Sequence, residues 1–160
     1  MEDIVKSIHI IKKDEAELSE QERELVKQAK ESTFRSYAPY SKFSVGAAVL
    51  LDNSEMICGS NQENCAYPSG LCAERTTLFY ANSRYPESKV LKICIAARNS
   101  AGDFTKEPIA PCGACRQVML ETEHRYGSPI TIMLYGTDGT YILNSARDLL
   151  PVEFDSDSLK

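Results

Sequence analysis

The pattern of apolar and polar positions predicts a first long helix near the start of the chain. It begins at Ser19, because Ser19 and Glu22 match the capping box, in which each side chain bonds to the backbone N–H of the other residue. The helix extends to about Ser36, and Pro39 then breaks it. Residues 1–18 interleave charges with a few apolar side chains and are expected to form a polar extension.

Two further helices are predicted from helical spacing and from the residues that end helices. The first covers Cys72 to about Ser83 and stops before Pro86. In the second, apolar residues recur at helical spacing from Cys112 onwards, and Gly127 ends the pattern.

Short apolar runs between these helices predict β-strands. The runs at 45–51 and 56–60 flank the turn residues Asp52 and Asn53 and are typical of a β-hairpin. The remaining elements are predicted, in chain order, as strands at 90–97, 130–135 and 141–143 and a short helix within 145–151.

The order of these elements predicts an α/β architecture. Strand 90–97, the helix that starts at Cys112 and strand 130–135 form a strand–helix–strand unit, whose two strands normally lie parallel. The hairpin adds antiparallel strands, so we expect a mixed sheet of about five strands. These elements are assigned to one domain, residues 19–160, which follows the extension 1–18.

Composition narrows the classes of function. A chain of 160 residues can bury a core without a metal, so a cofactor would serve chemistry. No apolar run approaches the ~18 residues that span a bilayer, and no membrane partner is expected. The first residues lack the pattern of a secretory signal, which predicts a cytoplasmic location, where cysteines more often bind metal or react than form disulfides. The net charge of −5 argues against a nucleic-acid partner.

The cysteines divide into two groups. Cys58 and Cys94 lie among apolar residues of predicted strands and are expected to be buried in the core. Cys112 and Cys115, three residues apart at the start of a helix, project from one face and can bind one ion. Cys72 supplies a third thiolate from the start of another helix, where the positive end of the helix dipole stabilises it.

Three thiolates suit one zinc ion per chain. Three protein ligands leave the fourth tetrahedral position open, as in catalytic zinc sites, whereas structural sites usually have four ligands. Nothing in the spacing of Cys65, His9 or His124 recommends any of them as a fourth ligand. Taken alone, the pair Cys112 and Cys115 is equally typical of a redox-active dithiol, so a metal-free redox protein is one alternative.

Charged residues beside the cysteines complete the candidate site. Glu74, two residues after Cys72, can lie beside the metal without binding it and transfer protons to and from a metal-bound water. Arg75 and Arg116 each lie next to a cysteine. We expect them to donate hydrogen bonds to the sulfurs and to offset the net charge of −1 that three thiolates and Zn²⁺ carry together.

These motifs resemble those of the small zinc-dependent cytidine deaminases of pyrimidine nucleoside salvage. LCAER followed by PCGAC matches the zinc-deaminase pattern in its three-cysteine form. The blocks YAPYSKFSVGAAVL, NQENCAYPSGLCAERT, PCGACRQVM and LLPVEF are similar in order and spacing, over about residues 25–159. The resemblance implies a three-layer α/β/α fold and the hydrolysis of cytidine or deoxycytidine to uridine or deoxyuridine and ammonia. Zinc-bound hydroxide would attack C4 of the base while Glu74 shuttles protons.

The resemblance also implies which residues hold the nucleoside. Asn61 and Glu63 would bind the ribose 3′-hydroxyl, and Phe43 would line the pocket. The backbone N–H of Ala73, at a helix start, would bond to the pyrimidine O2.

Two aromatic residues are implied to act between subunits, since family members of the three-cysteine type are homotetramers with shared sites. Phe154 would stack on the base in a neighbouring subunit, and Tyr67 would also reach across an interface. The extension 1–18 and the loop 98–110 are longer than is usual for this family.

Three other functions compete with this interpretation. A deaminase that edits polynucleotides needs a basic track and stacking aromatics, whereas this chain carries a net charge of −5 and no tryptophan. A blasticidin-type deaminase would share the fold and the metal site, and Asn61 and Glu63 favour a ribose over the antibiotic. A zinc-binding interaction module would have four protein ligands and would not need Glu74.

Overall fold

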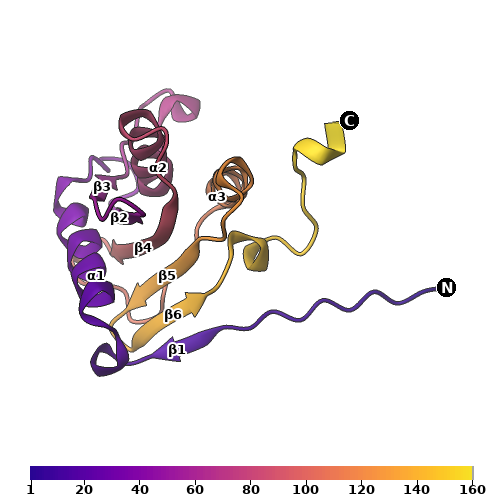
Figure 1. Ribbon diagram of the computed structural model, residues 1–160. Coiled ribbons are helices and arrows are strands. Elements are labelled where there is room, and N and C mark those ends of the chain that lie inside the picture. The colour runs from indigo at the N-terminus through magenta and orange to yellow at the C-terminus, as the bar shows by residue number, and fades with distance from the viewer. Residues whose placement is uncertain (160) are drawn as a thin grey trace.

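The computed structural model describes residues 1–159, which form a mixed six-stranded sheet with helices on both faces (Figure 1). The strands lie in the order β1-β6-β5-β4-β2-β3 across the sheet. Their bounds are β1 (Ile11–Lys13), β2 (Ser44–Leu51), β3 (Met56–Ser60), β4 (Val90–Arg98), β5 (Thr131–Gly136) and β6 (Gly139–Leu143). The α-helices are α1 (Glu20–Ser32), α2 (Ala73–Arg84) and α3 (Gly113–Tyr126).

Helix α1 begins where the capping box predicts. The Ser19 hydroxyl accepts a bond from the Glu22 N–H, and the Glu22 carboxylate accepts one from the Ser19 N–H. The α-helix ends at Ser32, and a 3-10 turn over Thr33–Arg35 continues the helical path. The two together therefore end next to the expected limit at Ser36.

The central strands confirm the predicted crossover. Strand β4 runs parallel to β5, with Ile93 opposite Ile132, and α3 connects them. Strand β2 runs antiparallel to both β3 and β4, which makes the sheet mixed. Helix α3 ends at Gly127, whose left-handed φ of 58° is the conformation that glycine adopts most readily at a helix end.

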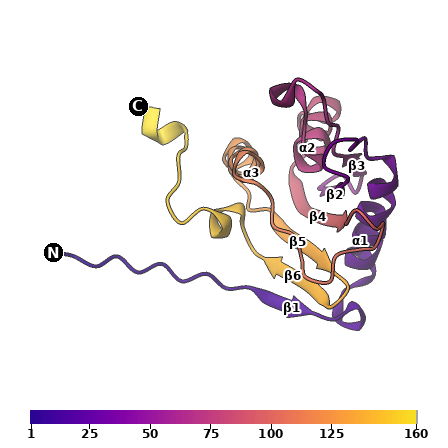
Figure 2. The ribbon, with the colours of Figure 1, turned by 180° about the vertical axis from the view of Figure 1, so that it is seen from behind.

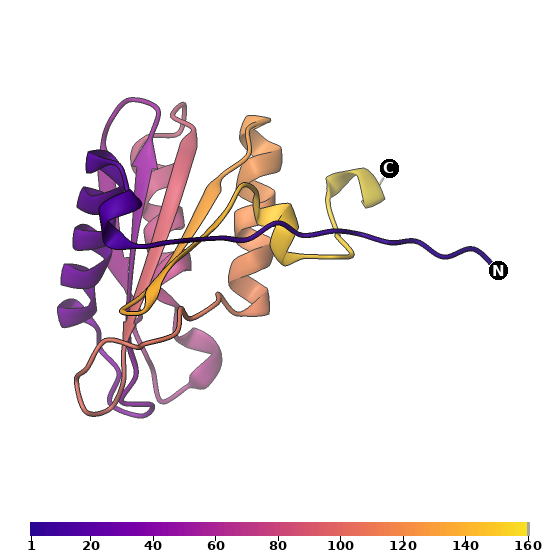
Figure 3. The ribbon, with the colours of Figure 1, turned by 90° about the horizontal axis from the view of Figure 1, so that it is seen from below.

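The helices cover the two faces of the sheet in an α/β/α arrangement (Figure 3). On one face, Leu25 and Ala29 of α1 belong to a buried cluster with Cys94 of β4. On the other, α2 and α3 pack over alternate residues of the same strands. Gly46 of β2 has no room for a side chain, because a Cβ atom there would lie 2.2 Å from the Ala29 carbonyl oxygen. Within residues 1–159, no helix is long and apolar enough to cross a membrane.

The sheet has one strand more than the sequence predicts. The additional strand is β1, which lies in the segment expected to be a polar extension and pairs antiparallel with β6, Ile11 opposite Ile142. Residues 1–10 continue from β1 away from the domain, so that both ends of the described chain project on the same side (Figure 2). A three-residue strand in a charged segment gives little periodicity from which to predict it.

An ion-paired carboxylate connects α1 to the sheet. Glu22, which is 6% exposed, accepts bonds from Lys92 of β4 at 2.8 Å and from Lys13 of β1 at 3.3 Å. Burial by itself raises the pKa of Glu22, but the bonds from Lys92 and from the Ser19 backbone outweigh it and lower the pKa to about 2. Glu22 therefore stays ionised well below the pH at which a free glutamate takes up a proton.

Candidate metal centre and adjoining pocket

Two helix starts bring three thiols together. Cys72 is the N-cap of α2 and Cys112 is the N-cap of α3, while Cys115 lies in the first turn of α3. The Sγ atom of Cys112 lies 3.7 Å from that of Cys72 and 3.4 Å from that of Cys115, and all three lie within 4.8 Å of one another. Neither cap sulfur accepts a capping bond from the backbone of its own helix, so both sulfurs are left for the shared cluster.

The chemistry of this donor set fits zinc. Thiolates are soft ligands that suit Zn²⁺, and three of them leave a fourth position for water or substrate. The cluster holds only these three candidate ligands among the described residues. His124 instead bonds to Ser156, and His9 lies in the exposed amino-terminal segment. The expectation of three protein ligands therefore agrees with the geometry.

Two of the thiols, Cys72 and Cys115, shift each other's pKa in opposite directions. The hydrogen bond from Cys115, assisted by bonds from Arg75 and Cys112, outweighs burial and lowers the pKa of Cys72 to about 5. The same bond raises the pKa of Cys115, because the proton that stabilises one sulfur stays on the other. Cys72 is thus the first thiolate of the site.

Glu74 lies in the first turn of α2 and is 4% exposed. Burial is the largest influence and raises the pKa of Glu74, and the nearby negative charge of Cys72 adds to the effect. No lysine or arginine in the described chain bonds to its carboxylate. Glu74 is therefore a buried carboxyl group that can hold a proton beside the three sulfurs.

The two arginines have different contacts. Arg75 donates from Nη2 to the Cys72 sulfur at 3.7 Å, as the sequence predicts. Its Nε atom is buried without a partner in the described structure. Arg116 instead donates to two backbone carbonyls, Pro111 at 2.8 Å and Leu149 at 3.0 Å. Arg116 therefore fixes the turn before α3, and no bond from it to a sulfur is present in the described chain.

A cavity of about 520 Å³ opens next to Cys72. Three residues that the sequence singles out for nucleoside or interface contacts, Asn61, Glu63 and Tyr67, line it together with Arg75. The other lining residues are Tyr40, Ser41, Gln62, Asn64, Gly70 and Leu71. Tyr40 and Ser41 were not predicted, although both lie in the block YAPYSKF. The structure thus places the cavity against the sulfur cluster.

Asn61 and Glu63 also organise the cavity wall. The Asn61 side chain accepts bonds from Val45 N–H and Ser36 Oγ and donates to the Phe43 carbonyl oxygen at 2.9 Å. These bonds leave one Nδ2 hydrogen of Asn61 for another acceptor.

Glu63 accepts backbone bonds from Tyr40 and Ser41 through one carboxylate oxygen. A hydrogen bond from the Ser41 side chain is the largest influence and lowers the pKa of Glu63, and the two backbone bonds add to this effect. Its second carboxylate oxygen is left for another donor, so Glu63 can accept while Asn61 donates.

Three predicted substrate residues do not line the cavity in this chain. Phe43 is half-buried beside it, and its carbonyl is the acceptor of the Asn61 amide. Ala73 is buried as the first residue of α2, after Cys72. Phe154 lies on the carboxy-terminal segment beside α3, where it is 58% exposed.

Comparison with known proteins decides the family. The model of the family described as the cytidine and deoxycytidylate deaminase zinc-binding region matches residues 19–126, which include all three clustered cysteines and Glu74. The chain belongs to this deaminase family. The zinc-binding region of the family and the Cys72, Cys112 and Cys115 cluster together identify one zinc ion as the cofactor.

Relatives across the deaminase family agree along most of the chain. A cytidine deaminase of Sporosarcina psychrophila is 35% identical over 135 residues, which cover 84% of this chain and 92% of that one. One from Halalkalibacterium halodurans is 46% identical over 99 residues, 61% of this chain and 68% of that one. The crystal structure of cytidine deaminase from Burkholderia pseudomallei superposes with a TM-score of 0.69 at 37% identity, covering 82% of this chain and 97% of that one.

Proposed function

We propose that this protein is a cytidine deaminase, which hydrolyses cytidine or deoxycytidine to uridine or deoxyuridine and ammonia. The observation that carries the proposal is the buried Glu74 beside three convergent thiols, one of which, Cys72, lines a nucleoside-sized cavity. The family and the relatives named cytidine deaminase support it.

The residues of this chain divide the reaction between them. Cys72, Cys112 and Cys115 hold the zinc, which when bound makes a water acidic enough to act as a nucleophile near neutral pH. Glu74 would accept a proton from the attacking water as the water oxygen bonds to C4, and would pass this proton to N3 of the base. Glu74 would then carry the remaining proton of the new C4 hydroxyl to the amino group, so that the C4–N bond breaks and ammonia leaves. Water and cytidine are thereby converted to uridine and ammonia.

The environment of Glu74 suits this shuttle. A carboxyl group must both take and give protons near neutral pH, and burial raises the pKa of Glu74 toward that range. Arg75 compensates the excess negative charge of the thiolates through its bond to Cys72, and it does not bond to Glu74. The positive charge of Arg75 therefore stabilises the thiolates, and the Glu74 carboxyl group stays free to exchange protons.

The cavity favours a nucleoside over other amino-pyrimidines. Asn61 supplies an amide hydrogen and Glu63 a carboxylate oxygen, which together match a ribose hydroxyl that accepts one bond and donates another. Phe43 and the Ala73 N–H complete the contacts to the base in this proposal. The carboxylate of Glu63 also disfavours a 5′-phosphate, because Arg75 is the only cationic residue of the cavity wall described and it bonds to Cys72. We therefore assign the nucleoside, and not its monophosphate, as the substrate.

The proposed assembly is a homotetramer with shared sites. Phe154 lies outside the cavity of its own chain, so a contact between Phe154 and a base requires a second copy. Tyr67 is 77% exposed at the cavity rim, where a neighbouring chain could contact it. Its ring packs edge-to-face on that of Tyr40, with 6.1 Å between the ring centroids. Both aromatic residues are consistent with a site that several copies complete.

The decisive experiment measures turnover of cytidine, deoxycytidine, cytidine monophosphate and blasticidin from the loss of ultraviolet absorbance. Purified protein should convert the two nucleosides, lose turnover when a chelator removes about one zinc per chain, and regain it with Zn²⁺. Fast turnover of blasticidin with negligible turnover of cytidine would replace the proposed substrate. Zinc binding with no turnover of any of them would favour an interaction module, and a reversible dithiol without zinc would favour a redox protein.

A further inference from the structure

The last described segment, residues 151–159, runs along the outer side of α3 and is here called the tail (Figures 1 and 3). It follows η4 (Ala146–Leu149), a short 3-10 turn. Its apolar side chains are exposed: Val152 by 88%, Phe154 by 58% and Leu159 by 74%. The tail therefore leaves several apolar side chains exposed, while the contacts that place its backbone are polar.

Polar groups of α3 hold the tail in that orientation. Gln117 donates from Nε2 to the Phe154 carbonyl oxygen at 2.8 Å, and His124 Nε2 lies 2.6 Å from Ser156 Oγ. Gln117 and His124 are seven positions apart, about two helical turns, so both project from one side of α3. The helix therefore binds the tail on either side of Asp155.

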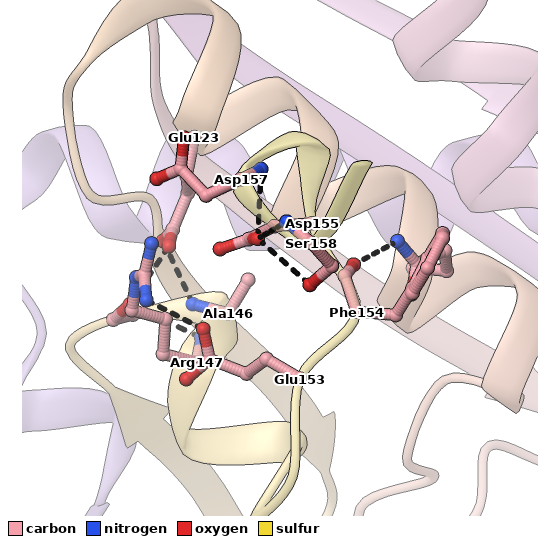
Figure 4. A network of polar contacts seen from close by, with 10 residues as sticks. Glu123, Ala146, Arg147, Glu153, Phe154, Asp155, Asp157 and Ser158 are labelled. Carbon is pink, nitrogen blue, oxygen red and sulfur yellow. Dashed lines mark hydrogen bonds and ion pairs between the residues drawn. The ribbon is translucent and has the colours of Figure 1, made fainter. Parts of the chain in front are cut away.

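Further contacts stiffen the tail before and after these two points (Figure 4). Arg147 forms an ion pair with Glu153, which is labelled beside it in the figure. The Asp155 carboxylate accepts bonds from the backbone N–H groups of Asp157 and Ser158, which closes a turn. The backbone is thus fixed by polar bonds while the Phe154 side chain stays free for another surface.

The amino-terminal end of α3 carries two of the three zinc-site thiols. Cys112 caps the helix and Cys115 lies in its first turn, and Gln117 follows within the second. One rigid helix therefore joins the metal centre to the tail. Phe154 nevertheless does not line the cavity of its own chain. A second copy of this chain is the occupant that the proposed shared site requires for the exposed face of the tail.

We propose that Gln117 and His124 are positioning residues for that shared site. They hold the tail so that Phe154 of one copy is already oriented when it meets the nucleoside bound in a neighbouring copy. The inference rests on the proposed deaminase function and deepens it, because it assigns nucleoside binding, not chemistry, to these two side chains. A preformed segment loses less conformational freedom on docking than a loose one, and this favours nucleoside affinity.

The test separates affinity from chemistry. Gln117→Met removes the donor at nearly constant length, and His124→Leu removes the ring nitrogens. Each should raise KM for cytidine about 3- to 10-fold, the effect of one lost hydrogen bond, with kcat within about twofold and zinc content unchanged. His124→Gln, which keeps a polar nitrogen, should restore most of the wild-type KM. Glu121→Gln, at an exposed position on the same helix, is the control and should match wild type.

A second readout does not depend on activity. The chain has no tryptophan, so Phe154→Trp gives a single fluorescent reporter on the tail. Its steady-state anisotropy should be high in the otherwise wild-type assembly and should fall when Gln117→Met or His124→Leu is added. Its emission should also shift to shorter wavelength as protein concentration rises, since a second copy then covers it.

Each result has a distinct meaning. Unchanged KM and unchanged anisotropy in both variants would overturn the positioning role. A fall in kcat with unchanged KM would also overturn it, because the residues would then act through the metal end of α3. If wild-type protein leaves cytidine untouched, the proposed function fails, and the anisotropy still decides whether the two side chains hold the tail.

Discussion

Two glutamates in the first turn of a helix, Glu22 of α1 and Glu74 of α2, have nearly the same burial and opposite properties. They are 6% and 4% exposed, and both lie where a helix dipole favours a negative charge. Bonds from Lys92, Lys13 and the Ser19 backbone lower the pKa of Glu22 to about 2. Glu74 has no such partners and has Cys72 as a negative neighbour, so burial raises its pKa.

The comparison teaches that a low exposed fraction and a helix-start position do not by themselves set the charge of a carboxyl group, because basic partners decide whether the effect of burial on the pKa is outweighed. A carboxylate bonded to two lysines stays ionised and fixes the elements that supply them. A carboxyl group without a basic partner can change its protonation state, which is what a proton shuttle needs. The ionised carboxylate under α1 therefore contributes to stability. The carboxyl group at the start of α2, beside the thiols of α2 and α3, is the one that can take part in proton transfer.

The largest effect should come from Glu74→Gln, which removes the proton carrier and keeps the shape. We expect kcat for cytidine to fall about 10³-fold, since general acid–base catalysis contributes on the order of 10² to 10⁴. Zinc content and the midpoint of urea unfolding should stay at wild-type values. A variant with substantial turnover would mean that another group moves the protons.

Glu22→Gln should produce the reverse pattern. Removing this carboxylate leaves Lys92 without its partner at 2.8 Å and should lower the free energy of unfolding by about 2 kcal/mol at pH 7. The kcat and KM for cytidine should change little, because Glu22 lies on the opposite face of the sheet from the thiols. Urea unfolding and the absorbance assay on the same sample measure both. A large loss of turnover in a fully folded variant would contradict the division between the two regions.

The same carboxylate predicts how stability depends on pH. Because folding lowers the pKa of Glu22 from 4.5 to about 2, its contribution is complete above pH 4.5. It is lost as the pH falls from about 4.5 to about 2, where the unfolded chain takes up a proton before the folded one does. Urea midpoints measured at pH 6, 4 and 3 should decline more steeply for wild type than for Glu22→Gln. Parallel declines would show that other groups govern acid unfolding.

The smallest effect is expected for Arg75, the positive group beside the thiols. Arg75→Gln removes the bond to the Cys72 sulfur and should weaken zinc retention or lower turnover about 10-fold, the lower end for partners of metal ligands. A chelator titration with a chromophoric zinc indicator measures retention. Arg75→Lys keeps the positive charge but lacks the planar guanidinium group. Its zinc retention and turnover should lie between those of wild type and those of Arg75→Gln. Wild-type values for both quantities in Arg75→Gln would remove Arg75 from the site.

Local signals in the sequence predicted much of this arrangement. The capping box at Ser19 and Glu22 placed the start of α1, and Gly127 placed the end of α3. The spacing of the cysteines predicted the cluster, because each relevant thiol lies at a helix start whose position the sequence indicates. Signals of this kind extend over a few residues and need no knowledge of the fold.

Contacts between distant residues could not be predicted. Lys92 meets Glu22 across 70 positions of sequence, and Arg116 reaches Leu149 across 33. The position of an arginine next to a cysteine in the sequence does not show whether its side chain bonds to the sulfur or to a carbonyl oxygen. For Arg116 this depends on η4, which packs nearby and supplies the Leu149 carbonyl. Asn61 was singled out for a ligand, yet most of its hydrogen bonds hold the cavity wall together.

Strand β1 has a consequence for solubility during folding and storage. An outermost strand offers unpaired backbone groups that can recruit another chain into intermolecular β-structure. In this sheet the edge strand is β1, which has only three residues, two of them lysines. One of these, Lys13, forms an ion pair with Glu22. The longer and more apolar β6, with Ile142 and Leu143 buried, is thereby kept from the boundary. Without β1, the backbone groups of β6 would be unpaired at the edge of the sheet, where they could pair with the strand of another chain.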